Sequence, residues 1–192
     1  MRDGWVETTL GEIAVLTIGK TPPRNEPRYW TASLDRPFCT IADMKQLRVD
    51  PHSEGVTRIA EDEGKARRVP AGSLLMSFKL TLGRIGFAAR DIFPNEAIVW
   101  IDPNLDIADQ RYLGLYLEAS DIAAHAGRAV KGKTLNSASL RSLSVVLPPL
   151  PEQRRIVDLI SRVDEAISVA ESVQQAGRQA LRSILAEHSA TA

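Results

Sequence analysis

Three prolines fall within the four residues 148–151, between an apolar run and a long charged segment. A proline at the first position of a helix costs nothing, because the N–H of that position has no partner within the helix. Glu152 follows, and its charge favours the positive end of the helix dipole. The pattern predicts a separate domain over residues 1–150 and one long helix over residues 151–188.

The predicted helix carries an apolar seam. Apolar residues recur in alternating steps of four and three, which is the heptad spacing of a coiled coil. A helix of about 35 residues is about 50 Å long, so a second copy of the same helix is the simplest partner for the seam. Gln174 and Gly177 interrupt the seam. They are compatible with a close crossing or a fixed register in an antiparallel pair of helices, or with a simple flaw in the seam. The residues assigned to dimerisation are Ile156, Ile160, Val163, Ile167, Ala170, Leu181 and Ile184.

The first 150 residues predict an α+β fold, so the whole chain is expected to be a mixed domain followed by one long coiled-coil helix. Short β-rich runs are separated by clusters of Gly, Pro, Asn and Asp. A helix is expected over about 108–126, where apolar residues recur at helical spacing, and a short one after Asn136 or Ser137. The runs that predict strands are 13–18, 37–41, 73–78, 85–89, 97–101 and 143–147.

Charge is unevenly distributed along the chain. The 24 basic and 24 acidic residues cancel, which taken alone argues against a nucleic-acid binder. However, the segments 65–90 and 127–151 contain basic residues and no acidic ones, whereas the segment between them is acidic. Such segregation is compatible with a basic face on a neutral protein, or with solvated loops that do not meet in space.

No catalytic motif emerges. The stretch Glu63–Gly64–Lys65, with Asp50 upstream, contains the residue types of a metal-dependent nuclease, but it reads as a loop and not as a strand edge that would hold two carboxylates on one metal. Phosphate-binding glycine loops and nucleophile elbows are absent from the sequence. The histidines are scattered without metal-ligand spacing: they are His52, His125 and His188. We expect neither catalysis nor a metal.

Cys39 is the single cysteine, which excludes an internal disulfide. No apolar run approaches the roughly 20 residues of a membrane span, and the N-terminus has no signal-peptide pattern. We therefore expect a cytoplasmic protein that does not bind membranes. Three aromatic residues are expected in the core: they are Trp30, Phe78 and Trp100.

Three stretches resemble the specificity subunits of type I restriction–modification systems. "LGEIAVLTIGKTPPRNEPRYW" (10–30) is similar to the family's opening L-G-(E/D)-I, G-x-T-P and Y-W. "VPAGSLLMSFKLTLGRIGFA" (69–88) is similar to its strand-turn-strand region, with Ser73 where the family often has Asp. "LPPLPEQRRIVDLI" (147–160) is similar to the P-P-(L/I)-x-E-Q-x-x-I that opens the family's helix.

The resemblance implies a target recognition domain that reads half of a bipartite sequence in double-stranded DNA. It also implies a helix that serves as a spacer and as a docking surface for methyltransferase subunits, with restriction subunits as further partners. The chain itself then needs no cofactor, because S-adenosylmethionine is bound by the methyltransferase subunit. Family members typically have two such domains and two helices, whereas this chain has one of each, so a homodimer would read a gapped palindrome.

Reading DNA needs side chains in loops that reach a groove, with Arg or Lys on guanine and Asn or Gln on adenine. The candidates for DNA contact are Lys20, Thr21, Arg24, Asn25, Arg28, Tyr29, Lys79, Arg84, Arg128, Lys131 and Lys133. An alternative is a coiled-coil scaffold or regulator that has the same fold and does not read DNA.

Overall fold

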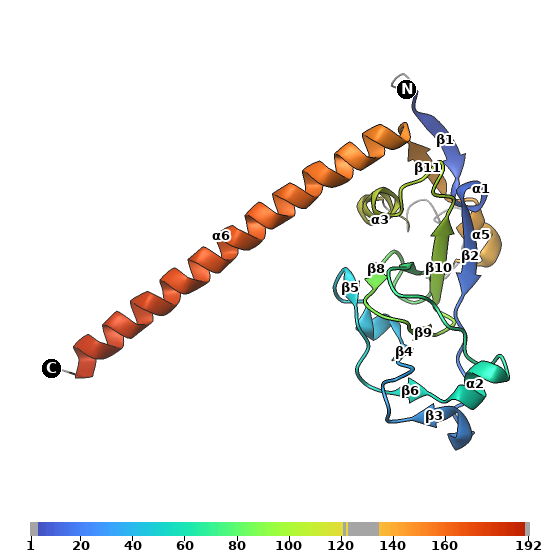
Figure 1. The fold of residues 1–192 in the computed structure, drawn as a ribbon, viewed down its shortest axis with the longest axis horizontal. Helices are drawn as coiled ribbons and strands as arrows, with labels where there is room; N and C mark the ends of the chain where they lie inside the picture. The colour runs from blue at the N-terminus through green and yellow to red at the C-terminus, as the bar shows by residue number, and fades with distance from the viewer. Residues whose placement is uncertain (1–3, 121, 123–134, 191–192) are drawn as a thin grey trace. The chain divides into compact units, whose positions relative to one another are not determined.

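The computed structural model describes residues 4–120, 122 and 135–190, and for residues 183–190 it describes the backbone alone (Figure 1). The chain divides into two compact units, Met1–Gln153 and Arg154–Ala192. The first unit is a mixed domain of strands and helices, and the second consists of helix. The predicted α+β class with a long C-terminal helix is confirmed.

The first unit is built on a five-stranded sheet with the order β2-β10-β7-β8-β5. All neighbouring strands are antiparallel except β5 and β8. The strands are β2 (Ala14–Ile18), β10 (Ile98–Pro103), β7 (Leu74–Ser77), β8 (Ile85–Ala88) and β5 (Arg48–Val49).

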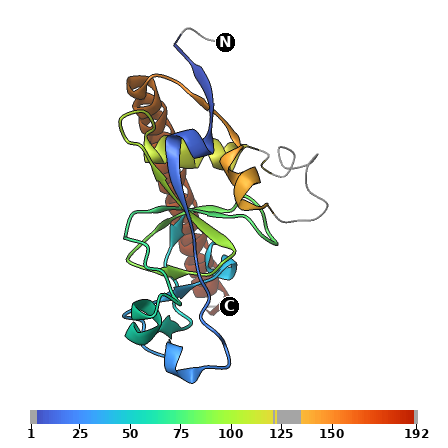
Figure 2. The same ribbon diagram turned by 90° about the vertical axis from the view of Figure 1, so that its right-hand side faces the viewer.

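The remaining strands form three two-stranded sheets. The pair β1–β11 and the pair β3–β6 are antiparallel, whereas β4 and β9 are parallel. Strands β3 and β6 gather with η1 and α2 at the end of the unit away from β1 and β11 (Figures 1 and 2). The bounds are β1 (Val6–Thr9), β11 (Ser144–Leu147), β3 (Trp30–Thr31), β6 (Gly55–Val56), β4 (Phe38–Cys39) and β9 (Phe93–Pro94).

The helices begin where the sequence offers capping side chains. Asp109 caps α3 by accepting hydrogen bonds from two backbone N–H groups, and Asn136 caps α5 in the same way from one. The helices are α1 (Leu10–Ile13), α2 (Arg58–Asp62), α3 (Gln110–Ala119), α5 (Ser137–Arg141) and α6 (Leu150–Ala190), with the 3₁₀ turns η1 (Pro27–Tyr29) and η2 (Ile41–Asp43). Among the described helices, none combines the length and the apolar character that crossing a membrane requires.

Each of the six predicted strand segments contains an observed strand, and the short helix begins after Asn136 as predicted. The helix predicted over 108–126 appears as α3, which ends at Ala119; residues 121 and 123–126 lie outside the described part. Strand β1 was not predicted, because its sequence Val-Glu-Thr-Thr has little apolar character and it forms by pairing with β11.

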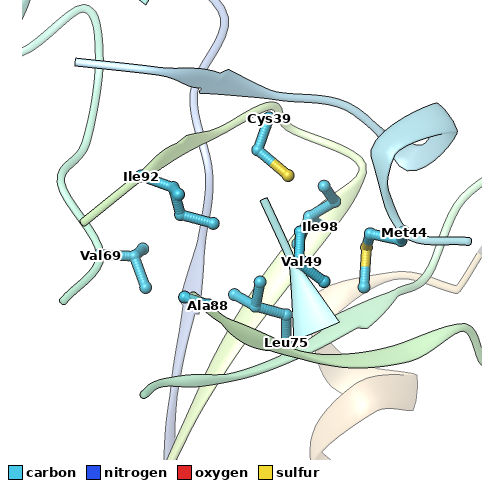
Figure 3. Packing of buried hydrophobic residues seen from close by; sticks show 8 residues of the cluster. All are labelled: Cys39, Met44, Val49, Val69, Leu75, Ala88, Ile92 and Ile98. Atoms are coloured by element: carbon cyan, nitrogen blue, oxygen red, sulfur yellow. The ribbon is translucent and has the colours of Figure 1, made fainter. Parts of the chain in front are cut away.

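The core lies on both faces of the central sheet. Leu74 and Leu75 are adjacent in β7 and fully buried, because successive side chains point to opposite faces. Leu75 belongs to the cluster shown in Figure 3, against which Trp100 packs. On the other face α3 covers the sheet, and a Cβ added at Gly114 would lie 2.8 Å from the Phe87 ring.

A second cluster, which includes the buried Tyr29 and Phe38, lies beside the first. Trp30 packs against it, with its ring edge toward Phe38 at a centroid distance of 4.9 Å. Phe78 is fully buried. The core position expected for Phe78 is therefore confirmed, whereas Trp30 and Trp100 are half-buried and pack against the two clusters from their margins.

Candidate nucleic-acid interface

Three segments that are far apart in the sequence come together at one end of the central sheet, where β2 and β7 end and β10 begins. Val99 of β10 lies opposite Ile18 of β2, and Ile98 lies opposite Ser77 of β7. Glu96 precedes β10 in the turn between these two partners, where the charge of Lys79 acts on its carboxyl. The Thr21 hydroxyl donates a hydrogen bond to the Glu96 carboxylate.

Gly19 makes this arrangement possible. A Cβ at position 19 would lie 2.3 Å from the carbonyl oxygens of both Pro94 and Asn95, closer than any side chain tolerates. The Gly19 N–H donates to Ile98 O at 3.0 Å, and the Lys20 N–H donates to Pro94 O at 2.9 Å. The loop after β2 is thus bound along its backbone to the turn that precedes β10.

The environment of Glu96 is electropositive. Partial burial by itself raises the pKa of the Glu96 carboxyl, but the hydrogen bond from Thr21 and the charges of Lys79 and Arg24 outweigh it, so the pKa lies below its usual value. Thr21, Arg24, Lys79 and Glu96 are called the strand-end cluster below. Its members offer donors, positive charge and one ionised acceptor on one surface.

The guanidinium of Arg24 lies over an aromatic ring. Its guanidinium carbon lies 3.7 Å from the centroid of the Trp30 ring, and its Nη1 lies 2.7 Å from a carboxylate oxygen of Glu54. The cation–π contact and the ion pair together restrict the position of the guanidinium. Asn25, the next residue, is exposed.

Lys20 and Arg28 connect the same loop to the end of α2. The Lys20 ammonium donates to the carbonyl of Gly64 at 2.9 Å. Arg28 forms ion pairs at 3.0 Å with Glu26 and with Glu63. Both basic side chains are exposed, so DNA phosphates could compete with these partners.

Tyr29 does not lie on the surface. It is 1% exposed in the second core cluster, and its hydroxyl donates to Glu63 at 2.6 Å. That hydrogen bond, together with burial, raises the pKa of the tyrosine. The prediction that Tyr29 contacts DNA is therefore wrong, because its ring is buried in the second core cluster.

The remaining candidates lie elsewhere. Arg84, half-buried at the end of the β7–β8 turn, donates to Ile41 O at 3.0 Å and is thereby bound to η2. Three candidates lie outside the described residues: they are Arg128, Lys131 and Lys133.

The alternative nuclease set is not assembled. Asp50 pairs with Arg90 at 2.8 Å, whereas Glu63 pairs with Arg28. Within the described ranges, no group of three or more His, Cys, Asp or Glu side chains could hold a metal ion.

Comparison with known proteins decides the family. Residues 2–175 match the family model described as the type I restriction modification DNA specificity domain. The chain belongs to this family. Two of the three resembling stretches of a specificity domain meet in the strand-end cluster, since Thr21 comes from the first and Lys79 from the second.

Relatives of this specificity domain are longer chains. The specificity subunit of the type I restriction enzyme EcoBI from Escherichia coli is 26% identical over 189 residues, which cover 93% of this chain and 38% of the relative. The specificity subunit of MjaIX from Methanocaldococcus jannaschii is 21% identical over 169 residues, covering 85% of this chain and 38% of the relative. The chain therefore spans about two fifths of the length of these relatives.

Solved structures show the same fold. The HsdS subunit from Thermoanaerobacter tengcongensis aligns with a TM-score of 0.69 at 20% identity, over 88% of this chain and 39% of that one. A chain from a study of complex assembly and conformational transition in the type I R-M system aligns with a TM-score of 0.74 at 20% identity, over 91% and 42%.

Glu96 was missed as a site residue by sequence reasoning. It belongs to the acidic segment between the two basic stretches, where no pattern marks a contact with DNA. Only the pairing of β10 with both β2 and β7 places its carboxylate among basic side chains.

Proposed function

We propose that residues 1–150 read one half-site of a bipartite DNA sequence as part of a type I restriction–modification complex. The observation that carries this proposal is the strand-end cluster, where two basic side chains, a hydroxyl and an ionised carboxylate share one edge of the sheet. Basic groups position the protein on phosphates, and paired donors and acceptors distinguish base edges. The family supports a DNA target, while the cluster supports this particular face.

The internal ion pairs predict how the domain would bind. Arg24 and Arg28 already have carboxylate partners, so DNA phosphates would have to compete with them. Exposed ion pairs are each worth about 1 kcal/mol or less, so they can be exchanged for phosphates. We therefore propose modest affinity with steep salt dependence, and partner subunits that supply the rest of the binding energy.

Helix α6 would serve as the spacer and as the dimerisation arm. It has 41 residues, which corresponds to about 60 Å. Within it, Val163 and Ile167 are each 51% exposed, and Ala170 and Leu181 are exposed too, whereas Ile156 and Ile160 are partly exposed. The side chain of Ile184 lies outside the described residues. An apolar row open to solvent along a helix supports pairing with a second copy.

We further propose that this chain catalyses no reaction. Methyltransferase subunits would bind S-adenosylmethionine and modify the DNA, and restriction subunits would cleave it. A pair of identical domains related by a twofold axis would then read an inverted repeat with an unread gap.

The test is a selection from a randomised duplex library by the full chain together with the methyltransferase subunit encoded beside it. We expect a sequence-specific site. Thr21→Ala with Lys79→Ala should weaken its selection at least tenfold and flatten the salt dependence by about one phosphate contact.

The matched control is Arg111→Ala, an exposed basic residue at the start of α3, near the end of β10 that is remote from Glu96. It should leave selection unchanged. Binding that is indifferent to sequence would support the scaffold alternative and contradict the proposal. An equal loss in the control would move the DNA contact away from the strand-end cluster.

A further inference from the structure

Leu80 has an unusual backbone conformation for its residue type. Its φ is 63°, and in the described part of the chain it is the one non-glycine residue with a positive φ. The left-handed region brings Cβ close to the following carbonyl oxygen and disfavours every residue with a side chain. Leu80 is also 75% exposed, so burial of its side chain does not compensate for the strain.

Hydrogen bonds show how this conformation is maintained. The Thr81 N–H donates to Lys79 O at 2.7 Å, which makes Leu80 the centre of a γ-turn of the strained type. The buried Ser77 hydroxyl donates to Thr81 O at 2.5 Å and accepts from the Arg84 N–H at 3.0 Å. The Gly83 N–H donates to Ser77 O at 2.9 Å. The surrounding turn therefore holds Leu80 rigidly at its tip.

Strain that the surrounding structure maintains is concentrated at functional sites. Glycine would relieve it at position 80, yet the chain has a leucine there. Because the side chain is exposed and the turn is supported from beneath by Ser77, the leucine contributes nothing to the core that alanine or glycine would remove. What leucine provides here and glycine would not is an exposed apolar side chain on a backbone that the turn holds in place.

The surroundings of Leu80 indicate what it would contact. Its neighbour Lys79 belongs to the strand-end cluster, and Thr81 on the other side is exposed and polar. An apolar side chain that is flanked along the chain by a cationic and a polar residue differs from the contiguous apolar patch that a protein interface needs. It suits a polyanion that presents single apolar groups. In the major groove of DNA, that group is the 5-methyl of thymine.

We propose that Leu80 is a specificity-determining residue that reads thymine through contact with its 5-methyl group. This inference rests on the proposed function, because it needs DNA at the strand-end cluster. Lys79 contacts the phosphate backbone beside the turn, and the rigid γ-turn holds the leucine against the base edge. Because the γ-turn already constrains the backbone at Leu80, less conformational freedom is lost on contact with the base than for a residue in a mobile loop.

The experiment uses the full chain with its methyltransferase subunit and the selected duplex, in which each thymine is replaced in turn by deoxyuridine. At one position in the half-site the loss of the methyl group should weaken binding to the wild type about fourfold. Leu80→Ala should weaken binding to the thymine duplex by a similar factor and make the two duplexes equivalent. Leu105→Ala is the matched control, since Leu105 is also exposed, at 64%, and follows the other end of β10. It should keep the wild-type discrimination.

Leu80→Gly separates a reading role from a structural one. Because glycine accepts a positive φ, this variant should unfold about 2 °C higher than the wild type while losing the thymine preference. A variant that unfolds earlier, or that keeps the preference, would overturn the proposal. An effect of Leu80→Ala that is equal on thymine and deoxyuridine duplexes would also overturn it, and would indicate insertion between base steps instead. If the wild type selects no sequence at all, the proposed function itself fails; if it selects a site that Leu80→Ala leaves unaltered, only the role of Leu80 fails.

Discussion

The side-chain amide of Gln153 accepts a hydrogen bond from the backbone N–H of Asp109 at 2.8 Å, across a separation of 44 positions. The amide is fully buried, and its Nε2 donates to Ile107 O at 2.9 Å and to Pro148 O at 2.7 Å. Asp109 in turn caps α3. One side chain in the first turn of α6 thereby satisfies backbone groups of the proline segment and of the segment that leads into α3.

Replacing Gln153 by methionine keeps the side-chain volume and removes all three hydrogen bonds. Buried backbone groups that lose their partner cost about 1–3 kcal/mol each, with part recovered by local rearrangement. We expect the free energy of unfolding of the first unit to fall by about 3 kcal/mol, measured by urea denaturation. Gln174→Met, at an exposed helical position, should change it by less than about 0.5 kcal/mol. Similar values for the two variants would contradict the role of Gln153.

Gly19→Ala tests the backbone contact between the loop after β2 and the turn before β10. The added Cβ would lie 2.3 Å from the carbonyl oxygens of Pro94 and Asn95, so the loop must move away from the turn that precedes β10. We expect a loss of about 2 kcal/mol in stability and weaker selection of the DNA site. Gly177→Ala is the control, because nothing lies within 4 Å of its added Cβ and alanine favours a helix by about 1 kcal/mol. It should stabilise the helix, and an equally stable Gly19→Ala protein would refute the contact.

Ile160→Asp combined with Ile167→Asp tests the dimer. Two charges on the apolar seam would be desolvated in a paired helix, so we expect monomers in analytical ultracentrifugation at micromolar concentration, with the first unit still folded. Ser161→Asp with Ser168→Asp introduces the same charges one position along the exposed helix and should leave the dimer intact. If the sedimentation coefficient of the Ile160 and Ile167 variant matches that of the wild type, the helix is not the dimer contact.

Removal of the seven residues Val169–Gln175 tests the spacer. One heptad corresponds to about 10 Å of helix, or about three base-pair steps, and the seam stays in phase. We expect a dimer whose preferred gap between half-sites contracts, detected by methylation mapping of the full complex on a randomised library. Removal of four residues, Val169–Ser172, breaks the phase and should weaken the dimer. An asymmetric site in the wild-type complex would refute the homodimer.

Cys39 is fully buried in the core cluster of Figure 3. Burial, with a smaller contribution from Asp43, raises the pKa of its thiol far above the usual value, so the reactive thiolate is scarce at neutral pH. We expect alkylation by iodoacetamide at pH 7.5 to be at least a hundredfold slower in the native protein than in urea. Alkylation at equal rates in both conditions would place Cys39 outside the core.

Sequence alone was sufficient wherever the determining interactions are local. The prolines at 148–151 end one element and begin the next, because each restricts its own backbone. Asn136 caps α5, and the period of the apolar residues separates helix from strand. The three stretches that resemble specificity subunits were sufficient for the family as well, since motifs are read along the chain.

The tertiary structure decided which of the candidate side chains share a surface. Thr21 and Lys79 meet at Glu96 because β10 pairs with β2 on one side and with β7 on the other, a choice that no local pattern reveals. The same packing moved Tyr29 from the candidate DNA surface into the core. The strain at Leu80 also appears only in the folded chain: the hydrogen bonds that maintain its positive φ are local, within residues 77–84, but nothing in the sequence marks that turn as strained at a leucine. Local propensities are properties of short segments, whereas strand register and burial arise from contacts between segments that are far apart in the chain.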